Sequence, residues 1–342
     1  MEKLLSIVVP VFNVEQYIGK CLDSLLVPEE QLKLLDIVVV NDGTPDKSAE
    51  IAKEYQVRYP EAFRVIDKKN GGHGSAWNRG IKEAKGKFLF FLDSDDWFDT
   101  QQFSVLISSL GQCETDLVFL NRTNYFASRN QEKIFRIKNL EPDRIYSSDE
   151  FDWINNGNGP CLTYCSTTVY RTAILQEYYP VFCEGVMYDD IILQVLPIMA
   201  SKSFVYKDLN VYHYRIGRPG QSHDPKVMAK RSDDFTIVLK SVLEFIKNHR
   251  ADLPEGSMRR VWADYHYSQF CTYHYEELSR FSYRNAKPRL ADWDSFVRES
   301  YPDIQLTPLV KAYRSLPFAV YYPFYKASAL TKKGLRRVLR MR

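Results

Sequence analysis

The chain has 342 residues, of which 45% are hydrophobic and 26% are charged, and its formal net charge is +3. These values indicate a globular protein with one large domain and a smaller one, and they exclude a chain that binds polyanions over its whole surface. The spacing of the six cysteines matches neither a zinc site nor a disulfide framework, so we expect reduced thiols and a cytoplasmic location. We expect neither a secretory signal nor a membrane span, because the apolar N-terminal run is short and is broken by Pro10.

The first hundred residues alternate predicted strands and helices. Short apolar runs rich in β-branched residues predict strands at 5–11, 36–40, 64–66 and 87–92, and apolar residues at helical spacing predict helices at 14–26, 46–59 and 75–84. Buried strands separated by helices indicate an α/β fold with a parallel sheet that is covered on both faces.

Polar residues follow three of these strands. Asn13, Asp42 and Asp93 each lie just past the end of a different strand. Because ligands bind beyond the carboxyl ends of parallel strands, we expect a binding site at this edge of the sheet. No Gly-x-Gly-x-x-Gly follows the first strand, which argues against a dinucleotide site.

After residue 100 the alternation weakens. The pattern predicts helices at 101–110 and 189–200, strands at 116–126, 167–170 and 204–206, and a hairpin or loop at 127–148. Beyond residue 226 strand signals are nearly absent, and 235–246, 258–280 and 293–301 predict amphipathic helices. We therefore expect an α/β domain over 1–225, with halves 1–100 and 101–225, and a helical region over 226–342.

The acidic turn Asp93-Ser94-Asp95-Asp96 follows a buried strand. Carboxylates at positions i and i+2 reach one side of such a turn, where they suit a hard divalent cation and the oxygens of a nucleotide diphosphate. The alternative is a solvated acidic loop that caps the next helix, which is also our preferred role for Asp96.

Four motifs occur in order along the first hundred residues. They are Ile7-Val8-Val9-Pro10-Val11-Phe12-Asn13, Val39-Val40-Asn41-Asp42-Gly43-Thr44, Asn70-Gly71-Gly72 and the acidic turn. This series resembles family 2 glycosyltransferases, closely over about residues 1–100 and more thinly to about residue 222. The resemblance implies a GT-A fold, which has a Rossmann-like core and a mostly parallel sheet, and transfer of a sugar with inversion from a nucleotide diphosphate donor.

The resemblance also assigns residues around the donor. Pro10, Phe12 and Asn13 would line the nucleotide pocket, and Asp42 would accept hydrogen bonds from the base, usually uracil. Asp93 would lie near the ribose and the metal. Asp95 would bind Mn²⁺ or Mg²⁺ directly and bridge it to the diphosphate, whose negative charge grows as the glycosidic bond breaks.

The loop Asn70-Gly71-Gly72-His73-Gly74-Ser75 resembles a recurring variant of the family pattern. Trp77 stands where many members have an arginine that holds the diphosphate, and Arg79 follows two residues later. Glycines before a helix let backbone N–H groups approach an anion. We expect Asn70, Gly72 and His73 to bind the donor, although His73 could equally be a loop residue without a role, and helical geometry could turn Arg79 away.

The pair Asp189-Asp190 begins an apolar helix, where aspartate also serves as a helix cap. Its place in the chain resembles the acidic pair of the family, usually Glu-Asp, whose second member is the catalytic base. The resemblance therefore makes Asp190 the base that takes the acceptor's proton and Asp189 an acceptor-binding residue.

The segment that follows the strand at 204–206 resembles one that folds over the donor diphosphate in the family. Arg215, Arg218 and Ser222 suit that role because guanidinium groups pair with phosphate oxygens, and His213 is a further candidate metal ligand. The alternative is a solvated loop with ordinary charges.

The C-terminal end is strongly basic. Residues 304–342 contain nine Lys or Arg and no Asp or Glu, and the pattern from Ala327 predicts a basic amphipathic helix that lies on an anionic bilayer. The alternative is a frayed soluble terminus.

We therefore predict an inverting hexosyl- or N-acetylhexosaminyltransferase of bacterial surface polysaccharide synthesis. It would use a UDP-sugar and a glycan or lipid-linked acceptor, with no nucleic acid, at the inner face of the cell membrane. A nucleotidyltransferase would need a Gly-rich basic segment after the first strand, where the chain has Phe12-Asn13-Val14-Glu15. The intact carboxylates argue against a non-catalytic carbohydrate-binding or scaffold protein.

Overall fold

A computed structural model describes residues 2–158, 162–217, 231–302 and 307–327. The chain forms two compact units, 1–262 and 263–342. The domain boundary that the sequence predicts near residue 225 falls outside the described residues and stays a prediction. No helix within the described ranges is long and apolar enough to cross a bilayer.

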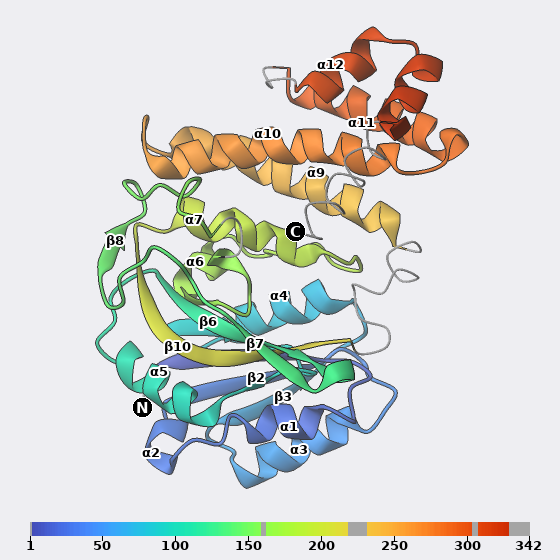
Figure 1. The fold of residues 1–342 in the computed structure, drawn as a ribbon. Helices are drawn as coiled ribbons and strands as arrows, with labels where there is room; N and C mark the ends of the chain where they lie inside the picture. The colour runs from blue at the N-terminus through green and yellow to red at the C-terminus, as the bar shows by residue number, and fades with distance from the viewer. Residues whose placement is uncertain (1, 159–161, 218–230, 303–306, 328–342) are drawn as a thin grey trace. The chain divides into compact units, whose positions relative to one another are not determined.

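One ten-stranded sheet forms the centre of the first unit (Figure 1). Its main path runs β3-β2-β1-β4-β9-β6-β10-β5, with β7 beside β6 and β8 beside β10. The strands are β1 (Leu5–Val11), β2 (Leu35–Asn41), β3 (Phe63–Asp67), β4 (Phe88–Phe91), β5 (Trp97–Phe98), β6 (Leu117–Phe126), β7 (Gln131–Phe135), β8 (Ile145–Ser147), β9 (Thr168–Arg171) and β10 (Ser203–Ile216). The first four strands are parallel, as predicted, and so are β6 and β10, whereas β9 is antiparallel to both of its neighbours.

Helices cover both faces of the sheet. The first face carries α1 (Ile18–Asp23), α2 (Glu29–Leu32), α3 (Ser48–Arg58) and α5 (Thr100–Leu110), and the other carries α4 (His73–Glu83), α6 (Thr172–Glu177) and α7 (Leu196–Ala200) (Figure 1). Alternate residues of each strand face the two layers. Ile37 and Val39 belong to the large core on the first face, and Val38 and Val40 pack on Ala76 of α4.

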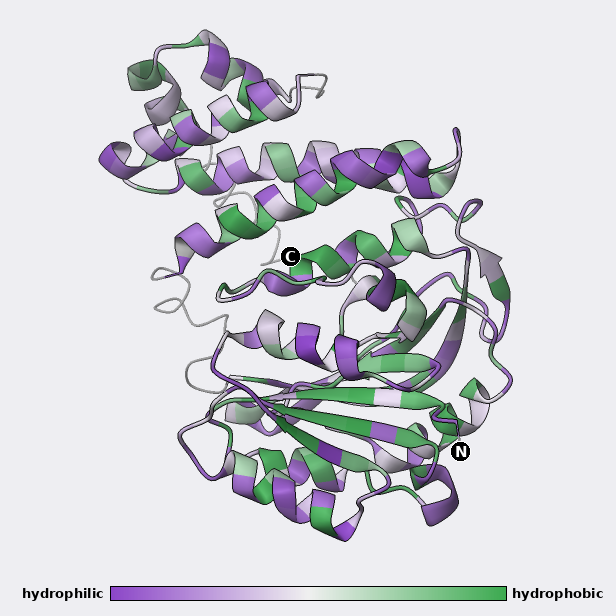
Figure 2. Ribbon diagram, turned by 180° about the vertical axis from the view of Figure 1, so that it is seen from behind, coloured by the Kyte–Doolittle hydropathy of each residue, from purple (hydrophilic) through white to green (hydrophobic). Residues whose placement is uncertain are grey.

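The strands are mostly hydrophobic, and the helices that cover them are banded with hydrophilic residues (Figure 2). Helix α4 lies close against β1 because residue 80 is glycine. A Cβ atom there would be 2.1 Å from Cγ1 of Val8, so a larger side chain would push the helix off the sheet.

Several predicted elements have other bounds in the structure, and α2, β5 and α6 were not predicted. The helix expected at 14–26 covers only Ile18–Asp23, and the one at 189–200 is divided into the 3₁₀ helix η3 (Asp189–Gln194) and α7. Strand β10 spans 14 residues instead of three, because it pairs along most of β6 and also with β5 and β8. The predicted hairpin forms, with β7 antiparallel to β6 after the 3₁₀ turn η1 (Ala127–Arg129).

Beyond the sheet the described chain is helical, as predicted. It contains α9 (Ser232–His249), η4 (Arg250–Asp252), α10 (Met258–Ser279), α11 (Tyr283–Ser300) and α12 (Pro308–Ser315). In the second unit the buried hydroxyl of Tyr275 donates to Asp294 at 2.6 Å, and Trp293 donates to the carbonyl of Cys271 at 3.1 Å. These bonds join α10 to α11.

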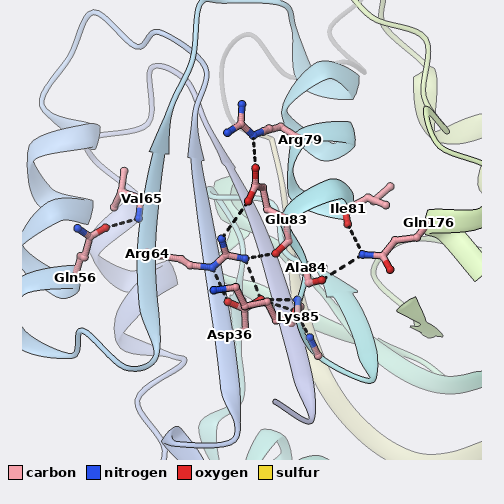
Figure 3. A network of polar contacts seen from close by, with 12 residues as sticks. Asp36, Gln56, Arg64, Val65, Arg79, Ile81, Glu83, Ala84, Lys85 and Gln176 are labelled. Atoms are coloured by element: carbon pink, nitrogen blue, oxygen red, sulfur yellow. Dashed lines mark hydrogen bonds and ion pairs between the residues drawn. The ribbon is translucent and has the colours of Figure 1, made fainter. Parts of the chain in front are cut away.

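A buried ion pair ties the first three strands to the end of α4 (Figure 3). The Asp36 carboxylate accepts from Arg64 Nε at 2.6 Å, from Ser6 Oγ at 2.7 Å and from the Lys85 amide at 3.0 Å. Arg64 also donates to the Glu83 carbonyl. Burial opposes ionisation of Asp36, but the hydrogen bonds outweigh it and lower its pKa.

We expect Arg64→Met to lower the free energy of unfolding by about 3 kcal/mol, because it leaves the Asp36 carboxylate buried without its partner. Lys53→Met, which breaks the exposed pair with Asp67, should cost less than about 1 kcal/mol. Urea unfolding at pH 7 measures both. The depressed pKa of Asp36 contributes stability above its unfolded pKa and loses it as pH falls, so the cost of Arg64→Met should shrink in acid. An equal loss of unfolding free energy in the two variants would contradict the conclusion that the Arg64–Asp36 pair is a buried pair that stabilises the fold.

Candidate active site

The acidic turn lies directly after β4, at the carboxyl end of the parallel strands. The side chains of Asp93 and Asp95 are partly exposed, and that of Asp96 is buried. The Tyr212 hydroxyl donates to Asp96 at 2.7 Å, and the Arg215 backbone N–H donates to the other oxygen at 2.7 Å. Asp96 therefore fixes the turn to β10.

Helix capping, the role that we preferred for Asp96, belongs to another residue. Asp99 is the N-cap of α5, and its carboxylate accepts from the Gln102 N–H at 2.9 Å. The short strand β5 separates Asp96 from that helix.

Negative charge is concentrated at the turn. Burial, followed by the charges of Asp95 and Asp93, raises the pKa of Asp96 well above its usual range. Oxygen ligands that are close to one another and partly exposed suit a divalent cation. Within the described ranges, however, no three His, Cys, Asp or Glu side chains form a metal-binding group.

His213 lies on β10 beside the turn. Its ring stacks on Trp97 with centroids 5.2 Å apart, and its Nε2 is 4.0 Å from Glu132. Desolvation lowers its pKa. The part of the chain that the structure describes does not group it with Asp93 and Asp95, and its role as a metal ligand stays a prediction.

The ring of His73 joins two acidic segments. Its Nε2 lies 3.0 Å from Oδ1 of Asp93, and its Nδ1 lies 3.1 Å from Oδ2 of Asp189. Desolvation opposes a charge on the ring, but the carboxylates of Asp189 and Asp93 outweigh it and raise the pKa of His73 well above its usual range. The imidazolium thus links the end of β4 to η3.

Trp77 packs against this ring. Its indole is buried and stacks on Phe91 with centroids 4.4 Å apart, and it contacts the His73 ring at a tilt with centroids 4.0 Å apart. Arg79 instead pairs with Glu83 at 3.0 Å, one turn later on α4. The tryptophan is therefore a packing residue here, and the arginine points along the helix.

The Asp42 carboxylate holds the glycine loop. It is buried and accepts from the N–H groups of Gly71 and Gly72 at 2.9 and 2.8 Å and from Lys68 Nζ at 2.6 Å. Asn70 donates to the Asp42 carbonyl at 2.9 Å. Lys68 did not stand out in the sequence, and contact with a nucleotide base stays a prediction for Asp42.

The remaining predicted donor residues surround the same edge. Pro10 is buried in β1, whereas the Phe12 side chain is 48% exposed directly after it. Asn13 has φ = 57°, a conformation that asparagine tolerates, and its N–H donates to Thr44 Oγ1 at 2.7 Å. The Asn13 hydrogen bond thus fixes the backbone directly after the exposed Phe12 ring.

Arg215 reaches the outer side of the acidic turn. Its Nε donates to the Asp95 carbonyl at 2.9 Å, and its guanidinium lies 4.9 Å from the Trp97 ring and 5.0 Å from the Tyr17 ring. Arg218 and Ser222 lie outside the described residues, so their predicted contacts stay predictions.

Asp189 and Asp190 open η3. Asp189 is buried, and Asp190 remains accessible to solvent although protein atoms crowd its carboxyl group. Desolvation by those atoms, and then the charge of Asp189, raise the pKa of Asp190 to about 6. This pKa suits a group that accepts a proton near neutral pH.

Asn78 attaches the segment before this pair to α4. Its buried amide oxygen accepts from Val181 N and Phe182 N at 3.0 and 2.9 Å, and its amide nitrogen donates to the Phe182 carbonyl at 2.9 Å and to Glu184 at 3.1 Å. The close approach depends on Gly74, where a Cβ atom would be 2.4 Å from the Cys183 carbonyl. Sequence reasoning missed this role, because the partners of Asn78 are about a hundred residues away.

We expect Asn78→Ala to release the segment that leads to Asp189-Asp190. The amides of Val181 and Phe182 lose their acceptor, so their hydrogen exchange should accelerate at least about tenfold. Arg79→Ala, one residue along α4, should leave both rates unchanged. Unaltered exchange in the Asn78 variant would mean that other contacts hold the segment.

Comparisons with known proteins agree with this arrangement. The chain is 38% identical over 150 residues to the uncharacterized glycosyltransferase EpsJ of Bacillus subtilis, a match that covers 44% of this chain and 42% of EpsJ. It is 30% identical over 217 residues to the putative glycosyltransferase EpsH of the same organism, covering 62% of this chain and 60% of EpsH. The chain thus spans less than two thirds of the length of each relative.

A solved structure shares the fold. The crystal structure of Staphylococcus aureus TarS 1–349 in complex with UDP-GlcNAc has a TM-score of 0.71 with 19% identity, over 96% of this chain and 92% of that one. This likeness confirms the predicted GT-A fold. A sequence model of glycosyl transferase family 2 matches residues 6–178, half of the chain. The chain therefore belongs to glycosyl transferase family 2.

Proposed function

We propose that the protein is an inverting glycosyltransferase that moves a sugar from a nucleotide diphosphate donor to an acceptor hydroxyl. The observation that carries this proposal is the position of His73, which brings the acidic turn and the Asp189-Asp190 pair together at the carboxyl end of the sheet. A transferase needs a group that stabilises the departing diphosphate close to a base for the incoming hydroxyl.

The donor in this proposal is a UDP-sugar, a choice supported by the structure of TarS, which was solved in complex with UDP-GlcNAc. The predicted donor residues are Pro10, Phe12, Asn13, Asp42, Asn70, Gly72, His73, Asp93, Arg215, Arg218 and Ser222. Of these, the exposed Phe12 ring is suited to contact the flat face of a base. The Asp42 carboxylate has less capacity to accept hydrogen bonds from a base, because it already accepts from three protein donors.

A divalent cation, Mn²⁺ or Mg²⁺, completes the proposed donor site. Asp93 and Asp95 fit it, because they are partly exposed carboxylates in one turn. After burial, their charges are the next causes of the raised pKa of Asp96. Two carboxylates leave positions for phosphate oxygens. When bound, the cation neutralises charge on the leaving diphosphate.

Asp190 is the proposed base. The acceptor oxygen forms a bond to the anomeric carbon while the bond to the diphosphate breaks on the opposite side, and the hydroxyl proton passes to Asp190. Its solvent-accessible carboxyl group and raised pKa support this role. Asp189 is buried and both of its carboxylate oxygens face His73 Nδ1, so we propose that it orients the Asp189-Asp190 pair. For the predicted contact with the acceptor, one of these oxygens has to turn away from His73.

The proposed acceptor is a glycan or a lipid-linked glycan of the bacterial surface. Two relatives support this choice by name, the minor teichoic acid biosynthesis protein GgaB of Bacillus subtilis and the poly(ribitol-phosphate) β-N-acetylglucosaminyltransferase TarS. The basic sequence after Ala327 supports work at the inner face of the cell membrane, although residues 328–342 lie outside the described structure.

We expect Asp95→Asn and Asp190→Asn to fail in different ways. Asp95→Asn should weaken Mn²⁺-dependent binding of UDP about tenfold or more, because a metal ligand loses its charge. Asp190→Asn should bind UDP nearly as tightly as the wild type but release UDP from UDP-GlcNAc at least about a hundredfold more slowly. Calorimetry and a UDP-release assay, with and without chelator, measure these effects.

Asp143→Asn is the matched control, because Asp143 forms an exposed pair with Lys207 and should leave both quantities unchanged. Equal loss of UDP affinity in the Asp95 and Asp190 variants would show that Asp190 is misassigned. A non-catalytic carbohydrate-binding protein would release no UDP at all.

The raised pKa of Asp190 predicts an acid limb in the pH profile. A base acts only when it is deprotonated, so kcat/KM for UDP release should be half-maximal near pH 6 and fall about tenfold for each lower pH unit. Stopped assays between pH 4.5 and 8 in constant ionic strength measure the profile. A constant kcat/KM down to pH 4.5 is the result that this assignment does not allow.

A further inference from the structure

A second group of side chains lies beside the acidic centre on the β6–β10 part of the sheet. Arg122 of β6 places its guanidinium carbon 5.1 Å from the ring of Tyr164, 5.4 Å from that of Tyr214 and 5.5 Å from that of Phe135. All four side chains are partly exposed, so the cluster is open to a ligand.

The Arg122 charge has no acidic partner within the described ranges. Its Nη1 donates to Ser166 Oγ at 2.9 Å, and in that part of the chain no other hydrogen bond or ion pair reaches its guanidinium. Partly buried arginines are usually paired, since a charge removed from water needs compensation. The free Nη2 donors are therefore available to an anion.

A second polar atom on the same strand lacks a partner among the described residues. Asn124 lies two residues from Arg122, on the same face of β6 and opposite Tyr214 of β10, and its Oδ1 is buried without a hydrogen bond. Unpaired buried oxygens are rare in native proteins and call for an explanation. The cluster thus contains a second polar atom that the described residues leave without a partner.

The cluster adjoins the acidic turn. Arg122 lies beside Tyr212 of β10, whose hydroxyl donates to Asp96 at 2.7 Å. Tyr214 precedes Arg215, whose N–H donates to the other Asp96 oxygen at 2.7 Å. An acceptor that is bound at the proposed site beside this turn can thus extend over the guanidinium.

We infer that Arg122, with the rings of Tyr164, Tyr214 and Phe135, is an acceptor subsite for a glycan or polyol that carries a negatively charged group, a phosphate or a carboxylate. This inference rests on the proposed transferase function and names its acceptor class. The guanidinium pairs with the anion through two parallel hydrogen bonds, and the rings pack on the apolar faces of the sugar or polyol.

The test measures binding of three oligomers of equal length to the full chain with UDP and Mn²⁺ saturating the donor site. The probes are a ribitol phosphate oligomer, a hyaluronan oligosaccharide and a neutral dextran oligosaccharide. We expect at least one of the two anionic probes to bind more tightly than dextran, and the one that binds identifies phosphate or carboxylate as the recognised group.

Arg122→Gln should weaken that binding about tenfold or more, because hydrogen bonds to a charged group are lost. Arg136→Gln is the control, since Arg136 follows β7, is exposed and pairs with Asp208, and it should bind the probe like the wild type. If Arg122→Gln does not fold, Arg122→Lys replaces it, and a loss of about threefold or more is expected because lysine lacks the planar fork.

Three results would overturn the inference: no anionic probe binds, dextran binds as tightly as the anionic probes, or the folded Arg122 variant binds like the wild type. In each case UDP with Mn²⁺ still binds and UDP is still released from UDP-GlcNAc. Loss of those two activities in the wild-type protein would instead defeat the proposed function itself.

Discussion

The contact on which the site depends is the imidazole ring held between two carboxylates. Asp93 follows β4 and Asp189 begins η3, and about a hundred residues separate them in the chain. With both ring nitrogens facing carboxylate oxygens, His73 carries a positive charge that each acid stabilises. The indole of Trp77 packs against the ring, with centroids 4.0 Å apart. Removing the ring would leave Asp93, Asp189 and Asp190 to repel one another, so the first residue of α4 sets the distance between the two halves of the site.

Small residues and one amide make this contact possible. Gly72 has φ = 87° and lies against Gly185, and the Gly185 N–H donates to the Gly71 carbonyl at 2.7 Å. Asn78 binds the backbone of the same segment one turn along α4. The start of α4 thus supports the donor loop on one side and the base segment on the other. A substitution at Gly72 or at Asn78 is therefore expected to disturb both the donor loop and the segment that leads to Asp189.

The sequence predicted the sheet and the acidic turn, because buried parallel strands are continuous apolar runs and the turn follows one of them directly. Only the family resemblance singled out Asp190, whose role as the base stays a prediction. The sequence did not predict the contacts of His73 and Asn78 or the direction of Arg79, since each depends on which distant segment packs on α4. The length of β10 was missed for the same reason. Tyr212 and Arg215 belong to this strand because it pairs with β6, and both residues bind the acidic turn through Asp96. The local sequence shows neither contact.

The charges around the proposed active site favour binding of the donor before the acceptor. The acidic centre is partly neutralised by His73, but Asp93, Asp95 and Asp96 still lie in one turn, and their mutual repulsion contributes to the raised pKa of Asp96. An anionic acceptor that approached this centre alone would be repelled. In the proposed mechanism, a cation bound with the donor would remove much of the repulsion, and the Arg122 cluster could then hold the anionic group of the acceptor. The proposed sites therefore favour donor binding before acceptor binding, and they imply that the affinity for the acceptor depends on the cation.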